Sequence, residues 1–294
     1  MDIAPVMRRF NLSGEAVLLQ NNVWEIGGEY ILKRYEDYNR LNRNLDCILF
    51  LAGEGLPVQV PVRLDDGKLF FEEAGARYVL LKKLFGEVVR EPYACENRLF
   101  ENAGEALALL HRALQKYNGA SLREGNLLGE ADGWMAAALE KSGWPFFTPE
   151  IYEGIVARLR EINDALPRQP IHRDVHFGNL LFSDCAFSGY LDFDLSHRNV
   201  RVFDLAYFCA GLLVGKENSP EAEHWFLMVE HIARGYERAT KLTEAEKRGF
   251  GCVMMCIELL FCAYFLDVGE RERAENAWFT CRFLLENQNR LHLA

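Results

Sequence analysis

The 294-residue chain has the composition of a globular protein, with 50% hydrophobic and 26% charged residues, and is long enough for one large core or two smaller ones. Its formal net charge is −10, and most of the acidic excess lies after residue 85. This disfavours a nucleic-acid partner, whose phosphates require a basic surface. The charge is compatible with a neutral or cationic substrate, although an acidic surface that only maintains solubility has the same composition.

The N-terminus and the cysteines indicate the compartment. The chain starts without the basic segment and unbroken apolar stretch of a secretory signal, so we expect a cytoplasmic protein. The eight cysteines are scattered and lack the paired short spacings of zinc sites, which predicts reduced side chains in the core. The apolar run 252–268 is shorter than a bilayer span and contains Glu258, so we predict a core helix and no membrane partner.

The first 85 residues predict strands around one helix. Segments 23–26 and 30–34 flank Gly27-Gly28, a hairpin signal, because both central positions of a two-residue turn need positive φ. The strand after this turn carries Lys33. Apolar residues at helical spacing then predict a helix over 37–52. A turn at residues 65–68 follows the segment 60–62, and further strands are expected at residues 69–71 and 78–81.

Long helices dominate the remainder of the chain. Helical periodicity predicts them at residues 99–115, 151–165, 221–239, 244–268 and 271–289. We therefore expect an α+β fold with a small β-rich lobe over residues 1–85, a larger helical lobe over residues 86–294, and a short connector at 82–86. Two lobes of this kind create a cleft in which a nucleotide can lie.

Three oxygen-bearing side chains follow one another at spacings typical of phosphoryl transfer. Asn179 lies five positions after Asp174, and Asp192 ends the apolar run Tyr190-Leu191. In a kinase catalytic loop, an Asp accepts the proton of the attacking hydroxyl and an Asn five positions later reaches a magnesium ion. A second acid on a nearby strand holds the metal that bridges the phosphates. The pattern predicts Asp174 as catalytic base and Asn179 and Asp192 as magnesium ligands.

These segments resemble the aminoglycoside phosphotransferase and choline kinase group of small-molecule kinases. The similarity runs from about Leu12 to the C-terminal helices and is most specific in three ordered motifs, His172-Arg173-Asp174, Asp192-Phe193-Asp194 and Asp204-Leu205-Ala206. The resemblance implies a bilobal, protein-kinase-like fold. It also implies an ATP- and Mg²⁺-dependent enzyme that moves the γ-phosphate to a hydroxyl of a small molecule, such as an amine, amino alcohol, sugar or aminoglycoside.

The resemblance also implies supporting roles for three further residues. His172 is expected to be a hydrogen-bonded scaffold rather than a proton carrier. Asp204 braces the catalytic loop in the family and can also cap the apolar helix that follows it. Asp194 occupies the position at which protein kinases carry Gly, and it either assists the metal or caps the next loop.

The resemblance places the nucleotide against Lys33, which neutralises phosphate charge. The loop 13–22 and the connector should contribute Ser13, Gly14, Asn21, Lys82, Lys83 and Leu84. This loop has one glycine where protein kinases have several. The Glu that usually partners the strand lysine is replaced by Asn44, so the partner of Lys33 stays open, with Asp46 as one alternative.

Two alternative functions remain. A nucleotide-binding pseudokinase with a regulatory role is suggested by Asn44 at the usual Glu position. A protein kinase is suggested by Ser219-Pro220-Glu221, which falls where an Ala-Pro-Glu-like motif is sought, but the same residues suit a helix start, with Ser as cap and Pro in the first turn. We therefore favour a small-molecule kinase, with the acceptor, the choice of ATP or GTP and the oligomeric state open.

Overall fold

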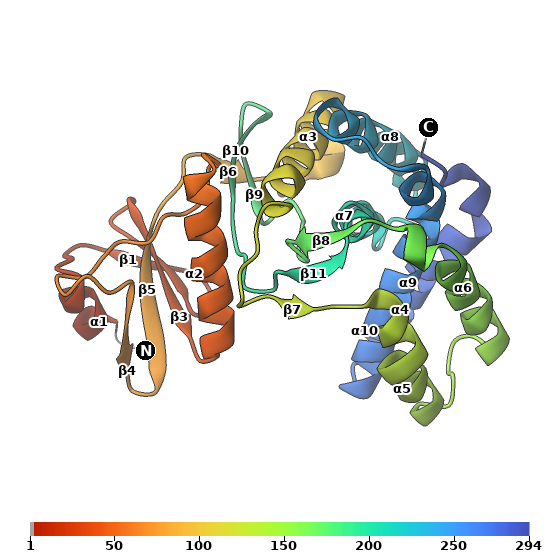
Figure 1. The fold of residues 1–294 in the computed structure, drawn as a ribbon, viewed down its shortest axis with the longest axis horizontal. Coiled ribbons are helices and arrows are strands. Elements are labelled where there is room, and N and C mark those ends of the chain that lie inside the picture. Colours follow the sequence, from red (N-terminus) through yellow and green to blue (C-terminus); the bar gives the residue numbers. More distant parts are fainter. Residues whose placement is uncertain (1–2, 294) are drawn as a thin grey trace. The chain divides into compact units, whose positions relative to one another are not determined.

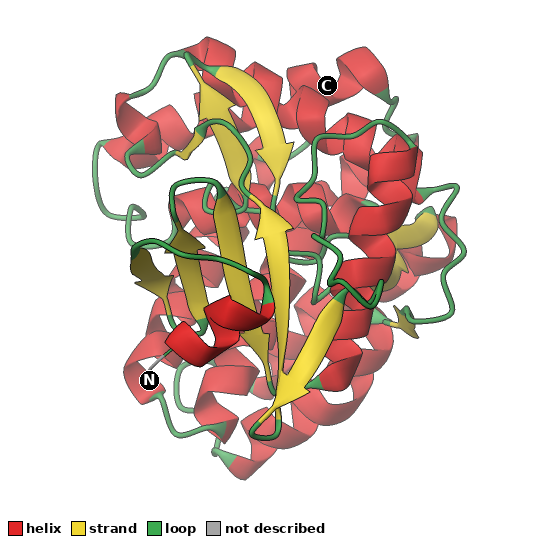
Figure 2. Cartoon of the chain, turned by 90° about the vertical axis from the view of Figure 1, so that its left-hand side faces the viewer, coloured by secondary structure: helices red, strands yellow, loops and turns green. Residues whose placement is uncertain are grey.

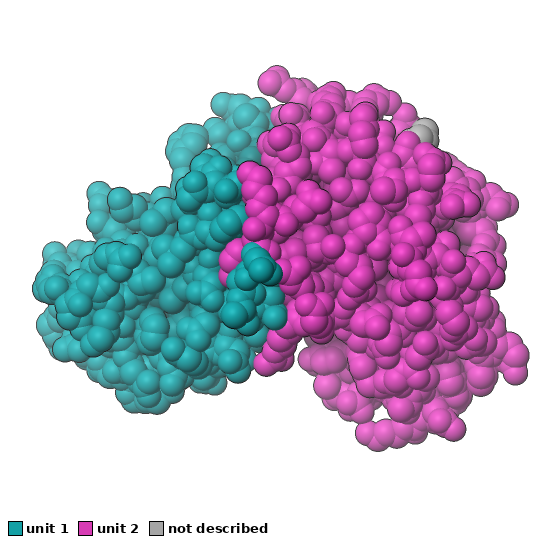
Figure 3. Space-filling view, viewed as in Figure 1, with its two compact units in different colours: residues 1–89, 118–122, 178–196 teal, residues 90–117, 123–177, 197–294 magenta. Residues whose placement is uncertain are grey.

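The structure, a computed structural model, describes residues 3–293, and the chain forms two compact units (Figure 3). The first unit comprises residues 1–89, 118–122 and 178–196, and the second comprises residues 90–117, 123–177 and 197–294. Sequence reasoning placed the lobe boundary at residue 85 and assigned everything beyond it to the helical lobe. Residues 178–196 instead make their contacts within the β-rich unit.

The first unit is built on a five-stranded antiparallel sheet with strand order β1-β2-β3-β5-β4 (Figure 1). Its strands are β1 (Ala16–Gln20), β2 (Val23–Ile26), β3 (Tyr30–Tyr35), β4 (Phe70–Glu73) and β5 (Ala76–Lys82). The predicted hairpin joins β2 to β3, and Gly27 and Gly28 have the expected positive φ, 59° and 75°. Its loop has three residues rather than two, because Ile26 pairs with Tyr30.

Helices cover both faces of this sheet. On one face, α1 (Ala4–Arg9) packs in an apolar cluster that includes Leu32 of β3, and Figure 2 shows this short helix beside the N label. Because side chains alternate along a strand, the neighbouring Lys33 faces the opposite side of the sheet. There α2 (Tyr38–Gly53) packs on β3, with Asp37 as its N-cap. The helix predicted over 37–52 is confirmed.

The segment expected to be a phosphate-binding loop, residues 13–22, is mostly a strand. Its central residues form β1, which pairs with β2, and Asn21 and Asn22 make the tight turn between the two strands. Asn22 has φ of 63°, a backbone conformation that asparagine adopts more readily than most residues. The pattern concealed this strand because its three central apolar side chains are all exposed: Val17, Leu18 and Leu19.

Both further strands predicted for this unit are present. The strands expected at 69–71 and 78–81 are β4 and β5. The segment 60–62 makes only a single bridge, between Pro61 and Leu81. A proline has no N–H to donate to a ladder, which limits this segment to the margin of the sheet.

A second, smaller sheet in the first unit carries one of the predicted metal ligands at its end. The hairpin of β9 (Leu180–Ser183) and β10 (Ala186–Tyr190) is extended by β6 (Glu87–Val88), in the order β10-β9-β6. Tyr190 N donates to the carbonyl oxygen of Pro57, 2.9 Å away, which ties the hairpin to the chain after α2. These contacts explain why residues 178–196 belong to the first unit.

The second unit is mainly helical. Its helices are α3 (Asn97–Leu114), α4 (Leu127–Glu130), α5 (Ala136–Lys141), α6 (Pro149–Ile162), α7 (Val202–Leu213), α8 (Glu221–Ala239), α9 (Glu244–Asp267) and α10 (Arg271–Glu286). The five long helices predicted from periodicity are α3, α6, α8, α9 and α10. A π-helical turn joins α4 to α5, and short 3₁₀ turns lie at Pro92–Ala94, Asn163–Ala165 and Gln288–Arg290. A small sheet of β7 (Arg123–Glu124), β11 (His197–Val200) and β8 (Arg168–Ile171) completes the unit.

Close packing of α3 on α8 orders this unit (Figure 1). Glycines permit the approach, because a Cβ on Gly104 would overlap the carbonyl oxygen of Ile232 and one on Gly235 would overlap that of Glu101. The two backbones therefore touch where any larger residue would separate them. This contact brings together His111 of α3 and Tyr236 of α8, whose Nδ1 and Oη atoms lie 2.7 Å apart.

The long apolar helix α9 lies in the core of the second unit. Among the described residues 3–293, it is the one helix long and apolar enough to cross a membrane by length and composition. In the structure, 78% of its most apolar 18-residue window is buried inside the protein, as predicted for a core helix. All eight cysteines are free and six are buried, three of them in α9: Cys252, Cys256 and Cys262.

Candidate active site

The predicted site residues divide between the two units. Lys33, Asn179, Asp192 and Asp194 belong to the first unit, whereas Asp174 belongs to the second, together with His172 and Asp204. The chain passes from the second unit to the first between residues 177 and 178, inside the motif recognised in the sequence. Each unit therefore contains its own part of the predicted site residues.

In the first unit, Lys33 and Asp192 form an ion pair. Lys33 Nζ lies 3.1 Å from Asp192 Oδ1, and the lysine, on the central strand β3, is only 7% exposed. Asp192 has φ of 63°, a left-handed conformation that costs free energy in a non-glycine residue. Such a cost is typical of functional segments whose surroundings hold the backbone in place. The partner of Lys33, open in the sequence, is this aspartate.

Asn44 of α2 makes different contacts from those expected of a glutamate at this position. It is buried, its Nδ2 donates to Tyr35 Oη at 3.1 Å, and its Oδ1 accepts from Phe193 N at 3.1 Å. It thereby fixes the backbone between the two aspartates that flank Phe193. Arg43 Nε donates to the carbonyl oxygen of Asp194 at 2.9 Å, a second tie from the same helix. Asp46, the alternative partner for the lysine, lies on the exposed face of α2.

Asp194 lies in a strongly perturbed environment. Burial, and then the hydrogen bond and charge of Asp192, raise the pKa of Asp194, while Lys33 opposes the shift. Two carboxyl groups so close together resist carrying two negative charges. A cation placed between them removes this repulsion, so the pair is suited to a divalent metal ion.

Asn179 lies beside this acidic pair. Its backbone carbonyl oxygen accepts a hydrogen bond from Leu191 N at 2.9 Å. This bond lies directly outside the last paired residues of the β9–β10 hairpin. The hairpin therefore brings Asn179 and Asp192, thirteen positions apart in the sequence, to its open end. Carboxylate and amide oxygens are ligands that Mg²⁺ accepts, so the three residues at this end fit a magnesium site: Asn179, Asp192 and Asp194.

A cavity of about 420 Å³ joins the ion pair to the turn between β1 and β2. Its lining includes Asn21, Lys33 and both aspartates, together with Arg34 and Arg40. Sequence reasoning missed Arg40, and its position in the first turn of α2, three residues after the N-cap, was the available signal. Ser13 and Gly14 do not line this cavity; they precede β1 and lie near the β2–β3 turn.

A second cavity in the first unit, of about 750 Å³, lies at the predicted connector. Lys83 and Leu84 line it, together with the turn between β9 and β10, whereas Lys82 ends β5 and is exposed. Lys83 Nζ lies 2.8 Å from Glu25 Oε2, so its charge is already paired. The side chain of Lys83 is therefore better suited to holding the connector on the sheet than to binding an anion.

In the second unit, Asp174 is held in its ionised form. Tyr207 Oη donates to Asp174 Oδ1 at 2.7 Å, and His176 Nε2 lies 3.7 Å from Oδ2. Burial opposes ionisation, but His176 and Tyr207 outweigh it and lower the pKa of Asp174. An ionised carboxylate with one oxygen fixed by a tyrosine is suited to accept a hydroxyl proton.

The loop that carries Asp174 is held by hydrogen bonds to the buried carboxylate of Asp204. Asp204 Oδ2 accepts from His172 N and Oδ1 accepts from Arg173 N, both at 2.8 Å. Arg173 has φ of 78°, so these hydrogen bonds hold a conformation that an arginine rarely adopts. His172 is fully buried, and its Nδ1 accepts from Asp174 N at 3.3 Å. Both residues position the loop.

The predicted capping role of Asp204 is wrong. Helix α7 begins at Val202, so Asp204 lies inside its first turn, and its oxygens accept from the backbone N–H groups of residues 172–173 instead of those of the helix. His111 Nε2 lies 3.1 Å from Asp204 Oδ2, and its Nδ1 lies 2.7 Å from Tyr236 Oη. Burial opposes ionisation of Asp204, yet the contact with His111 and the backbone N–H groups lower its pKa.

Tyr207 is a functional candidate that the sequence analysis did not single out. It follows Asp204 by three positions on α7, and residues three apart share one face of a helix. The signal was therefore present: a tyrosine on the helix face that already pointed at the catalytic loop. Only the contact with Asp174 shows what its hydroxyl does.

Comparison with known proteins decides the family. The profile of the phosphotransferase enzyme family (APH) matches residues 17–242. The chain belongs to this family. Both the predicted group of small-molecule kinases and the predicted enzyme class, a phosphotransferase, are confirmed. The predicted α+β fold of the family is confirmed as well.

Among curated relatives, the chain is similar to homoserine kinases. It is 30% identical to that of Gluconacetobacter diazotrophicus over 233 residues, which cover 76% of this chain and 69% of the relative. It is 27% identical to that of Zymomonas mobilis over 205 residues, covering 68% of this chain and 61% of the relative. The match thus spans less than two thirds of the Zymomonas protein.

Solved structures share the fold at low sequence identity. A GDP complex of aminoglycoside 2'-phosphotransferase-IIIa has a TM-score of 0.72 at 12% identity, covering 96% of this chain and 97% of that chain. A microcompartment-associated aminopropanol kinase has a TM-score of 0.69 at 18% identity, with complete coverage of both chains. An amicoumacin kinase, solved with AMP-PNP and Ca²⁺, has a TM-score of 0.69 at 19% identity, covering 99% and 95%.

Proposed function

We propose that this protein transfers the γ-phosphoryl group of Mg·ATP to a hydroxyl group of a small molecule. The observation that carries the proposal is the buried Lys33–Asp192 pair beside Asp194, in a cavity that also contains the β1–β2 turn. A cation and two acids that repel each other form a site suited to phosphates and a divalent metal together. The relatives named homoserine kinases and the fold shared with nucleotide-bound kinases support the same reading.

Residues of the first unit hold the nucleotide in this proposal. Lys33 neutralises phosphate charge, and Asn21 offers polar groups from the turn above the same cavity. Asn179 and Asp192 hold Mg²⁺, with Asp194 in support, and the metal when bound neutralises charge that develops on the phosphates. The connector at Lys83-Leu84 lines the separate cavity that we assign to the base of the nucleotide.

Residues of the second unit act on the acceptor. Asp174 takes the proton of the attacking hydroxyl. Tyr207 orients the Asp174 carboxylate by donating a hydrogen bond to Oδ1. Asp204 and His172 position the loop without touching substrate. Because little covalent chemistry falls to the protein, orientation and charge neutralisation carry most of the rate.

The structure weakens the motive for the pseudokinase alternative. Asn44 suggested a lost ion pair, but Lys33 has an acidic partner in Asp192 and Asn44 supports the backbone beside it. The protein-kinase alternative loses its motif, since α8 starts at Glu221 and Ser219 Oγ donates to the carbonyl oxygen of Lys216 in the turn before it. A catalyst of small-molecule phosphorylation fits these observations better than either.

An assay of ADP release with a panel of alcohol acceptors tests the proposal. The panel contains homoserine, aminopropanol, an aminoglycoside and a sugar, each with Mg·ATP and with Mg·GTP. We expect ADP formation that depends on both Mg²⁺ and one class of acceptor. Tight binding of Mg·ATP without turnover on any acceptor would instead favour the pseudokinase.

A further inference from the structure

The second unit contains a cavity of about 270 Å³ formed by α7, α9 and α10. It is lined by Tyr207, Gly211, Val214, Glu258, Phe261, Phe265, Arg273, Asn276 and Ala277. Its volume corresponds to roughly nine water molecules at about 30 Å³ each. This is room for a small molecule of the size of an amino alcohol.

The cavity contains a buried carboxyl group without a counter-ion. Glu258 is 3% exposed, and within residues 3–293 it has no hydrogen bond or ion pair. Burial, and then the like charge of Glu217, raise the pKa of Glu258 to about 8. A buried carboxyl left unpaired costs free energy, so a residue of this kind in the middle of a core helix needs a reason. A cationic ligand in the cavity supplies one.

The walls of the cavity are aromatic. The rings of Phe261 and Phe265 are stacked with their centroids 5.9 Å apart, and the ring centroid of Tyr207 lies 6.0 Å from that of Phe261. Aromatic faces attract cations, and the cavity already shows this preference, because Arg273 lies 4.1 Å over the ring of Phe265. The charge of Arg273 is paired with Glu270 at 2.7 Å, so it does not neutralise Glu258.

One residue connects this cavity to the catalytic loop. Tyr207 lines the cavity and its hydroxyl donates to Asp174 Oδ1. The side chain of Tyr207 therefore links a molecule bound beside Glu258 to Asp174, the proposed base. An acceptor with a cation at one end and a hydroxyl at the other matches this arrangement.

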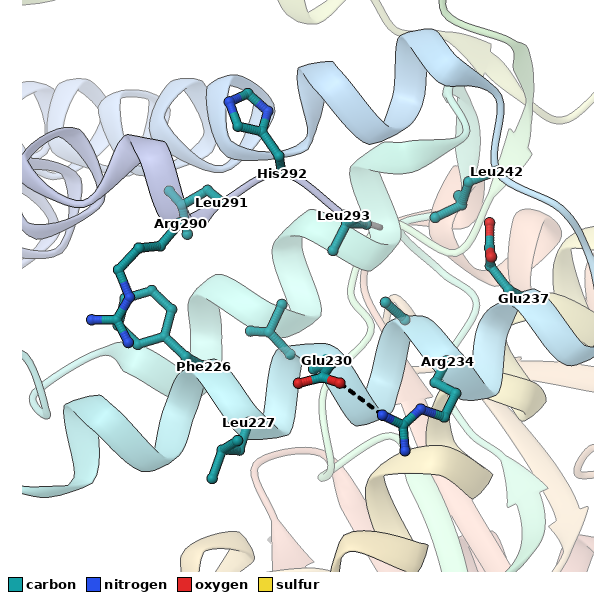
Figure 4. A pocket seen from close by; sticks show the side chains of 12 residues that line it. Phe226, Leu227, Glu230, Arg234, Glu237, Leu242, Arg290, Leu291, His292 and Leu293 are labelled. Carbon is teal, nitrogen blue, oxygen red and sulfur yellow. Dashed lines mark hydrogen bonds and ion pairs between the residues drawn. The ribbon is translucent and has the colours of Figure 1, made fainter.

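A larger cavity of the same unit, of about 630 Å³, has the opposite character (Figure 4). It lies between α8 and the C-terminal segment, and its charged side chains are paired with protein partners. Glu230 pairs with Arg234, as Figure 4 shows, Glu237 pairs with Lys247, and Arg290 pairs with Glu223. Of these two cavities of the second unit, the Glu258 cavity is therefore the one suited to an external cation.

We propose that the Glu258 cavity binds the ammonium group of an amino-alcohol acceptor, with Glu258 as its counter-ion. This inference rests on the proposed kinase function and names the class of its acceptor. The acids of the α9–α10 junction are poorer candidates, because Asp267 pairs with Lys141 and Glu270 with Arg273, all exposed. Aromatic rings and a buried carboxylate together favour an ammonium over a neutral alcohol.

Matched acceptor pairs test the inference on the whole protein. Homoserine is compared with 4-hydroxybutanoate, and 3-aminopropan-1-ol with butan-1-ol, by ADP release and by calorimetry in the presence of Mg·AMP-PNP. The first pair differs by the loss of the ammonium group, and the second by its replacement with a methyl group. We expect KM and Kd to be at least about 30-fold lower for one amine than for its neutral partner, as for the loss of a buried charge pair.

The variant Glu258→Gln keeps the shape and removes the charge. It should raise the KM and Kd for the amine by about the same 30-fold factor, with Mg·AMP-PNP affinity unchanged. Glu275→Gln, on the exposed face of α10, is the matched control and should behave as the wild type. Equal KM values in Glu258→Gln and wild type would overturn the inference while leaving kinase activity intact.

A second variant covers the case in which Glu258→Gln does not fold. Gly211 lines the cavity, and a Cβ added there would meet no heavy atom within 4 Å beyond its chain neighbours and the backbone of its own helix, so Gly211→Leu is the substitution chosen to fill the cavity from α7. We expect this variant to lose amine binding by calorimetry and to keep Mg·AMP-PNP binding. If amine binding depends on Glu258 and Gly211 but no ADP forms, the cavity assignment stands and the kinase proposal fails; if no amine binds, the inference is wrong.

Discussion

At the scale of single residues, the ionisation of Asp174 depends on two neighbours that oppose the effect of burial. Tyr207 donates a hydrogen bond to Oδ1 and His176 approaches Oδ2. Both contacts favour the carboxylate, so the pKa of Asp174 lies below its usual value. A group with a depressed pKa stays ionised as the pH falls until that lower pKa is reached, which keeps the proposed base active in mildly acidic solution.

Tyr207→Phe removes this hydrogen bond and keeps the ring. Because one of the contacts that lower the pKa is lost, the pKa of Asp174 should rise, and the acidic limb of the kcat/KM profile should move to higher pH. The magnitude of kcat at the optimum should fall less than in a variant of Asp174 itself. The measurement is a pH profile for both proteins, and an acidic limb at the same pH would show that Tyr207 does not tune the base.

At the scale of elements, α2 acts as a clamp on the segment that carries the predicted metal ligands. Asn44 and Arg43 both hydrogen-bond to the backbone of residues 193–194. The clamp explains how the strained Asp192 keeps its left-handed conformation. It also explains how an asparagine serves where a glutamate was expected.

Asn44→Leu should test this clamp. The substitution leaves the N–H of Phe193 and the hydroxyl of Tyr35 without their buried partner, which should lower the free energy of unfolding by about 1–3 kcal/mol. It should also weaken Mg·ATP binding, because the segment of Asp192 is no longer held. Urea denaturation and calorimetry measure the two effects. The control is Asp46→Ala on the exposed face of the same helix, expected within about 0.5 kcal/mol of wild type; equal stabilities for the two variants would contradict the clamp.

The elements differ in how well sequence predicted them. The long helices α3, α8 and α9 were predictable because their apolar residues repeat over many turns. Strand β1 was not, because its apolar side chains are exposed and do not alternate with buried ones. Asp174 and Asp192 were suggested by spacing, but the contacts of Asn44 with Phe193 and of Tyr207 with Asp174 join residues far apart in the chain. Local sequence patterns do not predict contacts of this kind.

At the scale of the whole molecule, the phosphotransferase motif is shared between two units. The chain crosses from the second unit to the first between Asp174 and Asn179, so the proposed base and the proposed metal ligands lie in different units. Sequence spacing identified the motif but not this division, which follows from the pairing of β9 with β6. The metal half and the acceptor half can therefore be tested separately.

The metal half predicts Mg²⁺-dependent stabilisation of the whole chain by nucleotide. A ligand at 100 times its Kd stabilises the folded protein by about 2.7 kcal/mol, so Mg·ATP should raise the melting temperature of wild type. Asp192→Asn should lose at least about tenfold in Mg·ATP affinity and most of this shift. Calorimetry with Mg²⁺ and with EDTA measures the Mg·ATP affinity, and Asp46→Asn is the control variant. Unchanged Mg·ATP affinity would remove Asp192 from the metal site.

The most direct measurement of the central claim is turnover by Asp174→Asn, assayed by ADP release with an acceptor that supports the wild type. The substitution keeps the size of the side chain and removes its capacity to take a proton. We predict a kcat lower by about 10²- to 10⁴-fold with unchanged Mg·ATP affinity, and wild-type behaviour for Asp164→Asn, an exposed aspartate of the same unit. A wild-type kcat in Asp174→Asn would contradict the account.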